Sequence, residues 1–122
     1  MKPQSSVVFF PCKDIKETVK YYTEVIGLEV YKDVGNTVWF DCGYGYIAFV
    51  QYSDGRPMAS GVCISFNMAS TQDVDEVYKK LQNSSAIGLR GKPEKHSVFP
   101  VYSFFLSDPN GYTLEFQKPL DK

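Results

Sequence analysis

Three side chains in the second half of the chain have the chemistry for catalysis or ligand binding: Glu115, Cys63 and His96. A carboxylate such as Glu115 binds a cationic or hydrogen-bonding group, or acts as a general base when burial raises its pKa. Cys63 is a nucleophile only with a base beside it, and the single histidine, His96, is the base that the sequence offers. Without such a pairing, Cys63 is expected to be a small buried thiol.

The surroundings of Glu115 and His96 favour binding over catalysis. Polar Thr113, Glu115 and Gln117 alternate with apolar residues, as on the solvated face of a strand. No second acid or base stands beside Glu115, so we interpret it as a ligand contact rather than a catalytic group. His96 lies among charged residues of a loop, where an exposed histidine has no special role by default.

Aromatic residues make up 16% of the chain, which is more ring surface than a small core needs. Strand alternation predicts that Trp39, Tyr46, Phe9 and Ala48 share one concave face, with Tyr102 at its rim. Aromatic walls with few polar anchors are typical of small-molecule sites. The predicted ligand-binding residues are therefore Phe9, Trp39, Tyr46, Ala48, Cys63, Ser65, Tyr102 and Glu115.

The elements that must position these residues follow from apolar spacing and cap residues. In the first half we expect a strand over 6–12, a helix that starts after Asp14 and ends at Gly27, and strands over 28–34, 37–41 and 46–52. In the second half we expect a strand over 62–68, a helix capped by Ser70, a short strand over 86–90, a charged loop over 91–97, and strands over 102–106 and 112–117.

The two halves repeat one another in order and spacing. Val-Phe-Phe at 8–10, Asp-Ile-Lys-Glu at 14–17 and Ile-Gly-Leu at 26–28 are echoed by Ile-Ser-Phe at 64–66, Asp-Val-Asp-Glu at 73–76 and Ile-Gly-Leu at 87–89. The fold prediction is α+β, one domain of two βαβββ modules at 1–57 and 58–122 whose curved mixed sheets pair around a cavity.

Charge and cysteine usage exclude several classes of protein. A net charge of −1 gives no electrostatic case for binding nucleic acid or an anionic membrane, and no stretch approaches a membrane span. Cys12, Cys42 and Cys63 are odd in number and lack C-x-x-C spacing, which argues against a disulfide framework or a zinc knuckle. A reduced, cytoplasmic setting fits best.

Several motifs together resemble those of a known superfamily. They are Asp14 before a helix that holds Tyr21 and Tyr22, Ile-Gly-Leu at 26–28, and Asp-Pro-Asn-Gly-Tyr-Thr-Leu-Glu at 108–115. The chain resembles the vicinal oxygen chelate superfamily, which groups glyoxalases, extradiol dioxygenases, fosfomycin-resistance enzymes and bleomycin-resistance proteins. The resemblance spans essentially the whole chain. It specifies the fold and leaves the substrate open, because this fold has many activities.

The resemblance implies that catalytic members hold a divalent metal through His, Gln or Glu residues on four strands. These positions fall on Val7, on Ala48 (or Phe49 if the register slips by one), on Cys63 and on Glu115. Val7 and Ala48 have no donor atom, and a retained metal needs at least three protein ligands. We therefore expect no metal and no cofactor. The resemblance also implies a homodimer, in which halves could be exchanged between chains.

The resulting functional hypothesis is a metal-independent small-molecule binding protein, closest in character to the bleomycin-resistance branch. It would sequester an aromatic or antibiotic-like ligand against Trp39, Tyr46 and Phe9, with Glu115 or Ser65 holding a polar end. The alternative is a glyoxalase-like lyase or isomerase, or a dioxygenase-related enzyme, that uses Glu115 with a non-standard metal or none. A third hypothesis is a regulatory or immunity-type module that binds a partner.

Overall fold

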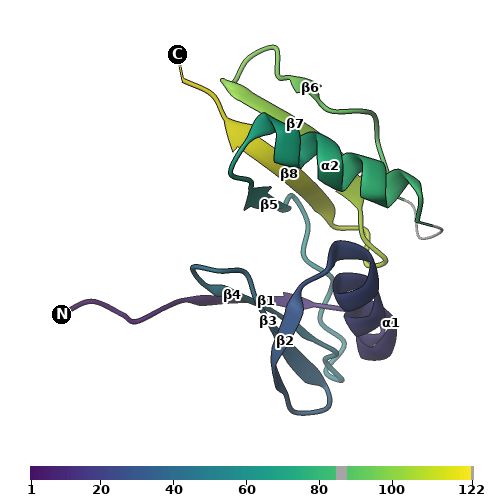
Figure 1. The fold of residues 1–122 in the computed structure, drawn as a ribbon. Helices are drawn as coiled ribbons and strands as arrows, with labels where there is room; N and C mark the ends of the chain where they lie inside the picture. The colour runs from purple at the N-terminus through teal and green to yellow at the C-terminus, as the bar shows by residue number, and fades with distance from the viewer. Residues whose placement is uncertain (85–87, 122) are drawn as a thin grey trace. The chain divides into compact units, whose positions relative to one another are not determined.

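The computed structural model of the chain describes residues 1–84 and 88–121. The chain divides into two compact units, residues 1–60 and 61–122 (Figure 1). Each unit is a βαβββ module with one four-stranded mixed sheet, which confirms the α+β prediction. Within the described residues no helix has the length and apolar character needed to cross a membrane.

The first unit contains β1 (Val7–Pro11), α1 (Ile15–Lys20), η1 (Tyr21–Ile26), β2 (Glu29–Asp33), β3 (Thr37–Asp41) and β4 (Tyr46–Val50). Its strands lie in the order β1-β4-β3-β2. The β1 and β4 strands are parallel, whereas the other neighbours are antiparallel. All four strands fall within the ranges predicted for them.

The helix of the first unit begins and ends as its cap residues predict. The Asp14 carboxylate accepts a hydrogen bond from the Glu17 amide at 3.1 Å, and Gly27 ends the helix at φ = +89°. Its second half, η1, is wound as a π-helix, a feature that the apolar spacing did not predict. The fully buried Tyr22 ring packs against Phe49 at 4.6 Å and Phe40 at 5.7 Å between ring centroids, which fixes the helix on one face of the sheet.

The second unit contains β5 (Cys63–Asn67), α2 (Thr71–Gln82), β6 (Glu94–Lys95), β7 (Val101–Ser107) and β8 (Thr113–Pro119). Its strands lie in the order β5-β8-β7-β6, with β5 parallel to β8. Ser70 caps α2 as predicted, because its hydroxyl accepts from the Asp73 amide at 3.0 Å. The α2 helix lies along one face of this sheet, over β7 and β8 (Figure 1).

The edge of the second sheet differs from the prediction. The two-residue strand β6 lies inside the segment predicted to be a charged loop. The short strand predicted over 86–90 lies partly outside the described residues. Of the part that is described, Leu89 forms an isolated bridge with Leu106.

The turn between β7 and β8 explains its Asp-Pro-Asn-Gly sequence. The buried Asp108 carboxylate accepts from the amides of Asn110 at 2.9 Å and Tyr112 at 2.8 Å. Gly111 has φ = +87°, a conformation that disfavours residues with a Cβ. The turn sets the register in which β8 returns along β7, and with it the position of Glu115 opposite Phe105.

We expect Asp108→Ala to lower the free energy of unfolding by about 1–3 kcal/mol, because two buried amides lose their acceptor. Urea denaturation followed by circular dichroism measures this loss. Asp108→Asn is the matched control, since it keeps one carbonyl oxygen and should lose less. Equal stability of wild type and Asp108→Ala would contradict this account of the turn.

Candidate functional site

Strand alternation gives the first sheet one face packed under the helix and one open face. Phe9, Ala48 and Trp39 lie side by side on the open face, because Phe9 pairs with Ala48 and Ala48 pairs with Trp39 across β1, β4 and β3. Tyr46 lies two residues before Ala48 on the same face. The structure thus brings together the four residues predicted for this half. Ala48 is fully buried beneath its neighbours.

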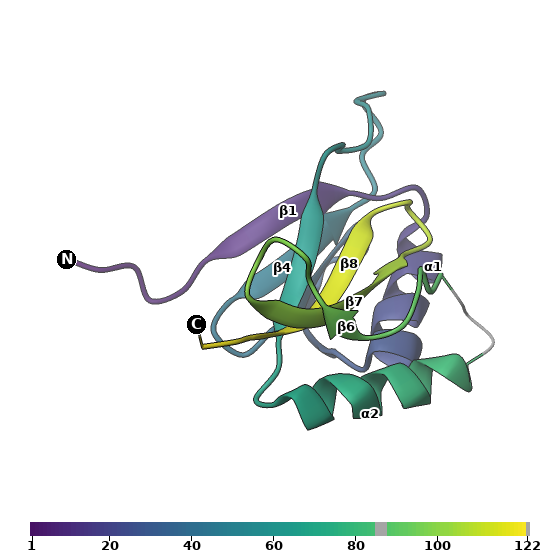
Figure 2. The same ribbon diagram turned by 90° about the horizontal axis from the view of Figure 1, so that it is seen from above.

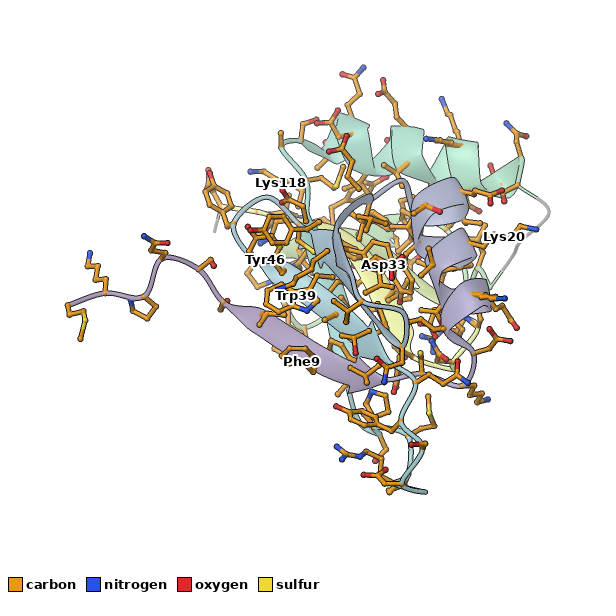
Figure 3. All side chains as sticks on the ribbon, turned by 90° about the horizontal axis from the view of Figure 1, so that it is seen from below. Phe9, Lys20, Asp33, Trp39, Tyr46 and Lys118 are labelled. Carbon is orange, nitrogen blue, oxygen red and sulfur yellow. The ribbon has the colours of Figure 1, made fainter. Side chains whose placement is uncertain are left out.

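The rings on this face form one cluster. The Trp39 ring lies 5.7 Å from Phe9 and 5.8 Å from Tyr46, between ring centroids. Figure 3 shows Phe9, Trp39 and Tyr46 in a row that runs across the strands. Tyr31 completes the cluster, 4.4 Å from Tyr46 and 6.1 Å from Trp39. We call Phe9, Tyr31, Trp39 and Tyr46 the aromatic face.

Tyr31 was not among the residues predicted for this face, and it reaches the face at a bulge in β2. The register shifts between Val30 and Lys32, so both Tyr31 and Lys32 lie against Trp39. The Lys32 ammonium is 5.5 Å from the Trp39 ring centroid, a cation–π contact. A hydrogen bond with the Tyr31 side chain raises the pKa of Tyr46 above its ordinary value. The aromatic face is therefore held together by polar as well as apolar contacts.

The open face of the second sheet is polar. Across β5 and β8, Cys63 pairs with Thr113 and Ser65 pairs with Glu115. One step further along, the Gln117 amide donates to the Asn67 side chain at 2.9 Å. The structure thus places Cys63, Ser65 and Glu115, three of the predicted ligand-binding residues, on one face of the second sheet.

Tyr102 is not brought together with these residues. Its side chain lies on the opposite face of the second sheet, where its hydroxyl donates to the Asp75 carboxylate of α2 at 2.6 Å. This bond raises the pKa of Tyr102, because the neighbouring carboxylate disfavours a phenolate. The role of Tyr102 in the structure is to connect β7 to the helix.

Glu115 lines a cleft of about 430 Å³ within the second unit. We call this the Glu115 cleft. Its apolar wall comes from β7 and the preceding loop, and its polar groups come from β8 and that loop. The lining residues are His96, Phe99, Pro100, Val101, Phe105, Glu115 and Gln117. Such a volume, with apolar walls and a few polar groups, suits a small organic molecule.

His96 has a defined position in this cleft, which its loop sequence did not predict. The half-buried ring lies beside the Phe99 ring at a tilt of 43°, with 5.1 Å between centroids. Its Nδ1 accepts from the amides of Val98 at 3.0 Å and Phe99 at 3.1 Å. Because Nδ1 is an acceptor, the neutral ring has its proton on Nε2. Nε2–H is the group that His96 can offer to a ligand.

The geometry argues against a nucleophilic Cys63. Cys63 is exposed, which differs from the buried thiol expected from the sequence. Partial desolvation and the charge of Glu115 still raise the pKa of its thiol, and the opposing charge of Arg90 does not reverse this. A nucleophilic cysteine needs a lowered pKa. No hydrogen bond joins Cys63 to His96 within the described part of the chain. The influence of Glu115 and Arg90 on the pKa of Cys63 indicates that both side chains lie near this thiol.

The positions at which the family resemblance implies a metal do not fit one. Val7 and Ala48 are in the first unit and have no donor atoms, which leaves Cys63 and Glu115. Among residues 1–84 and 88–121, no three His, Cys, Asp or Glu side chains lie close enough to hold an ion together. A thiol of raised pKa and one carboxylate fall short of a retained site.

Comparison with solved structures shows the fold. A glyoxalase/bleomycin resistance protein/dioxygenase from Nocardioides is 16% identical, with a TM-score of 0.79 over 99% of this chain and 86% of that one. A family enzyme of the same description from Burkholderia phytofirmans is 17% identical, with a TM-score of 0.79 over 94% and 98%. A lactoylglutathione lyase from Agrobacterium tumefaciens is 21% identical, with a TM-score of 0.72 over 96% of each chain.

A comparison with curated proteins found no match. The family model of the Glyoxalase/Bleomycin resistance protein/Dioxygenase superfamily matches residues 5–116, nearly the whole chain. The match includes the Asp-Pro-Asn-Gly turn and both βαβββ modules except the last three residues of β8. This chain belongs to the Glyoxalase/Bleomycin resistance protein/Dioxygenase superfamily.

Proposed function

We propose that this protein binds a small organic molecule without a metal ion, and that the Glu115 cleft holds it. The observation that supports this most directly is the make-up of that cleft, in which one carboxylate faces an aromatic wall. Phe105 pairs with Glu115 on neighbouring strands, so ring and carboxylate lie at a fixed spacing. A ligand with an apolar body and one cationic or hydrogen-bonding group is complementary to this arrangement.

The aromatic face of the first unit also supports a binding function, because its rings offer a surface on which a ligand can stack. Its rings include the exposed Phe9 and Tyr31, and Trp39 is half-buried. Exposed rings that are already ordered by contacts with one another lose little entropy when a flat ligand stacks on them. We propose that this face binds flat or aromatic groups. An aromatic or antibiotic-like ligand is the class that such a surface favours.

A second candidate function is metal-free acid–base catalysis of the glyoxalase type. One observation favours it: His96 and Glu115 line the same cleft, with the Nε2–H of His96 available as a proton donor. In such an enzyme Glu115 would take a proton from the substrate and His96 would give one. Incubating each bound compound with the protein and analysing it by NMR distinguishes the two functions. Conversion that is lost in both Glu115→Gln and His96→Gln identifies the catalyst.

A thermal-shift screen of aromatic amines and amides tests the binding function. A compound at a hundred times its Kd should stabilise the fold by ~2.7 kcal/mol. The shift should be unchanged by a metal chelator. It should be abolished or greatly reduced by Glu115→Gln and by Phe105→Ala, because each removes one side of the cleft.

The control for this screen is Glu29→Gln, which removes an exposed carboxylate from the first unit. It should leave the shift intact. If Glu115→Gln and Phe105→Ala also leave the shift of every stabilising compound intact, the Glu115 cleft is not the binding site. Loss of every shift in chelator would show that a metal is required.

Alkylation of Cys63 by iodoacetamide tests the neighbourhood of Glu115. The pH at which alkylation reaches half its maximal rate should lie above the ordinary thiol pKa. Glu115→Gln should lower that pH, because removal of a negative charge favours the thiolate. Arg90→Gln should raise it. Peptide mass spectrometry resolves Cys63 from Cys12 and Cys42, and an unchanged midpoint in both variants would contradict the proposed proximity.

A further inference from the structure

A second cleft, of about 480 Å³, lies between the segment 90–97 and strand β7. We call it the basic cleft. Three cationic side chains and a histidine line it, against a single carboxylate from Glu94. The lining residues are Arg90, Gly91, Lys92, Glu94, Lys95, His96, Ser97, Ser103, Phe104 and Phe105. The excess of positive charge is local, because the whole chain has a net charge of −1.

The segment that forms the basic cleft is bonded to β7 at both ends. At one end the Arg90 amide donates to the Phe105 carbonyl at 3.0 Å. At the other end β6 pairs with β7, and the His96 amide donates to the Val101 carbonyl at 2.9 Å. Figure 2 shows the chain turning from β6 through a loop into β7. The backbone around the basic cleft is therefore ordered before any ligand binds, which lowers the entropic cost of binding.

Two side-chain hydrogen bonds orient Arg90. Its guanidinium donates to the Thr113 hydroxyl at 2.6 Å and to the Leu106 carbonyl at 3.3 Å. Both bonds use one terminal nitrogen, Nη2, so they orient the guanidinium without using its other N–H groups. An oriented guanidinium is the group that proteins use most effectively to bind carboxylate and phosphate oxygens.

The cations of the basic cleft are not neutralised by protein carboxylates. Within the described part of the chain, the one ion pair shorter than 4.0 Å joins Arg56 to Asp54, in the first unit. Arg90, Lys92 and Lys95 line this cleft with no carboxylate of the described residues bonded to them, and Lys95, which pairs with Tyr102, also lines a neighbouring hollow with Asp75. Like charges that line a cleft with low-dielectric walls concentrate the field there and attract anions.

We propose that the basic cleft is an oxyanion site, which binds the carboxylate or phosphate group of a small organic anion. Arg90, Lys92 and Lys95 supply the charge, and the Ser97 and Ser103 hydroxyls are further donors at its wall. Phe105, which also lines the cleft, is the apolar surface for the organic part. This site shares His96 and Phe105 with the Glu115 cleft but does not use the Glu115 carboxylate, so it stands whether or not Glu115 binds a ligand.

The test is titration of ¹⁵N-labelled protein with phenyl phosphate, with inorganic phosphate and phenylacetate as further probes. Binding should shift the amide signals of residues 90–97 and of Phe105. Lys92→Glu/Lys95→Glu should weaken phenyl phosphate binding about tenfold or more. The matched control is Lys79→Glu/Lys80→Glu, the same charge change on exposed lysines of α2, and it should change the affinity by less than about twofold.

Comparison of the probes identifies the recognised group. Equal binding of phenyl phosphate and inorganic phosphate shows that the oxyanion alone is bound, and tighter phenyl phosphate binding that Phe105→Ala removes shows the organic contact. Either result supports the site. Absence of shifts at residues 90–97, or equal weakening by the two double variants, overturns it. Because Glu115→Gln retains Arg90, Lys92 and Lys95, it should not weaken phenyl phosphate binding, so failure of the Glu115 cleft leaves this result unaffected.

Discussion

In each unit a single helix covers one face of a four-stranded sheet, and alternate residues of every strand must therefore divide between a packed face and an open one. Tyr22 against Phe40 and Phe49 fixes this division in the first unit. In the second unit Phe104 and Phe116 stack at 5.5 Å on the face that α2 covers. A slip of one residue in any strand would exchange the two faces, so the packing of these rings determines which side chains remain available to a ligand.

The two open faces differ in chemistry although the two modules have the same order of elements. The first presents the rings of the aromatic face, and the second presents serine, asparagine, glutamine and glutamate side chains above two clefts. The positions that the family resemblance associates with a metal follow the same division. They are apolar in the first unit, and a cysteine and a glutamate in the second. A metal site that needs ligand atoms from both modules receives none from these positions of the first module. Apolar contacts with an organic ligand do not need metal-ligating atoms.

Much of this arrangement follows from the sequence, because it depends on local patterns. The caps at Asp14 and Ser70, the helix end at Gly27 and the strand Thr37–Asp41 depend on neighbouring residues alone. The shared face of Phe9, Trp39 and Tyr46 follows from alternation along strands. The π-helical turn at 21–26 was not predicted, since the same apolar spacing also describes an α-helix.

The remaining features depend on contacts between distant residues. Tyr31 reaches the aromatic face through a bulge that exists only in the pairing with β3. Tyr102 turns toward α2 because Asp75 accepts its hydroxyl, 27 residues away in sequence. Arg90 was predicted at the end of a short strand and His96 in a charged loop, yet backbone bonds to β7 place both in the walls of clefts. No pattern within residues 90–97 shows where its bonding partners lie.

The central claim is that a small molecule binds the open face of the second sheet without a metal ion. The most direct measurement is an amide chemical-shift map of the chelator-treated protein with a compound that raises its melting temperature. The account predicts that the largest shifts fall on His96, Phe105, Glu115 and Gln117. Shifts confined to the groove beside α1, which Ile15, Val19 and Val38 line, or binding that returns only when a divalent metal is added, would contradict it.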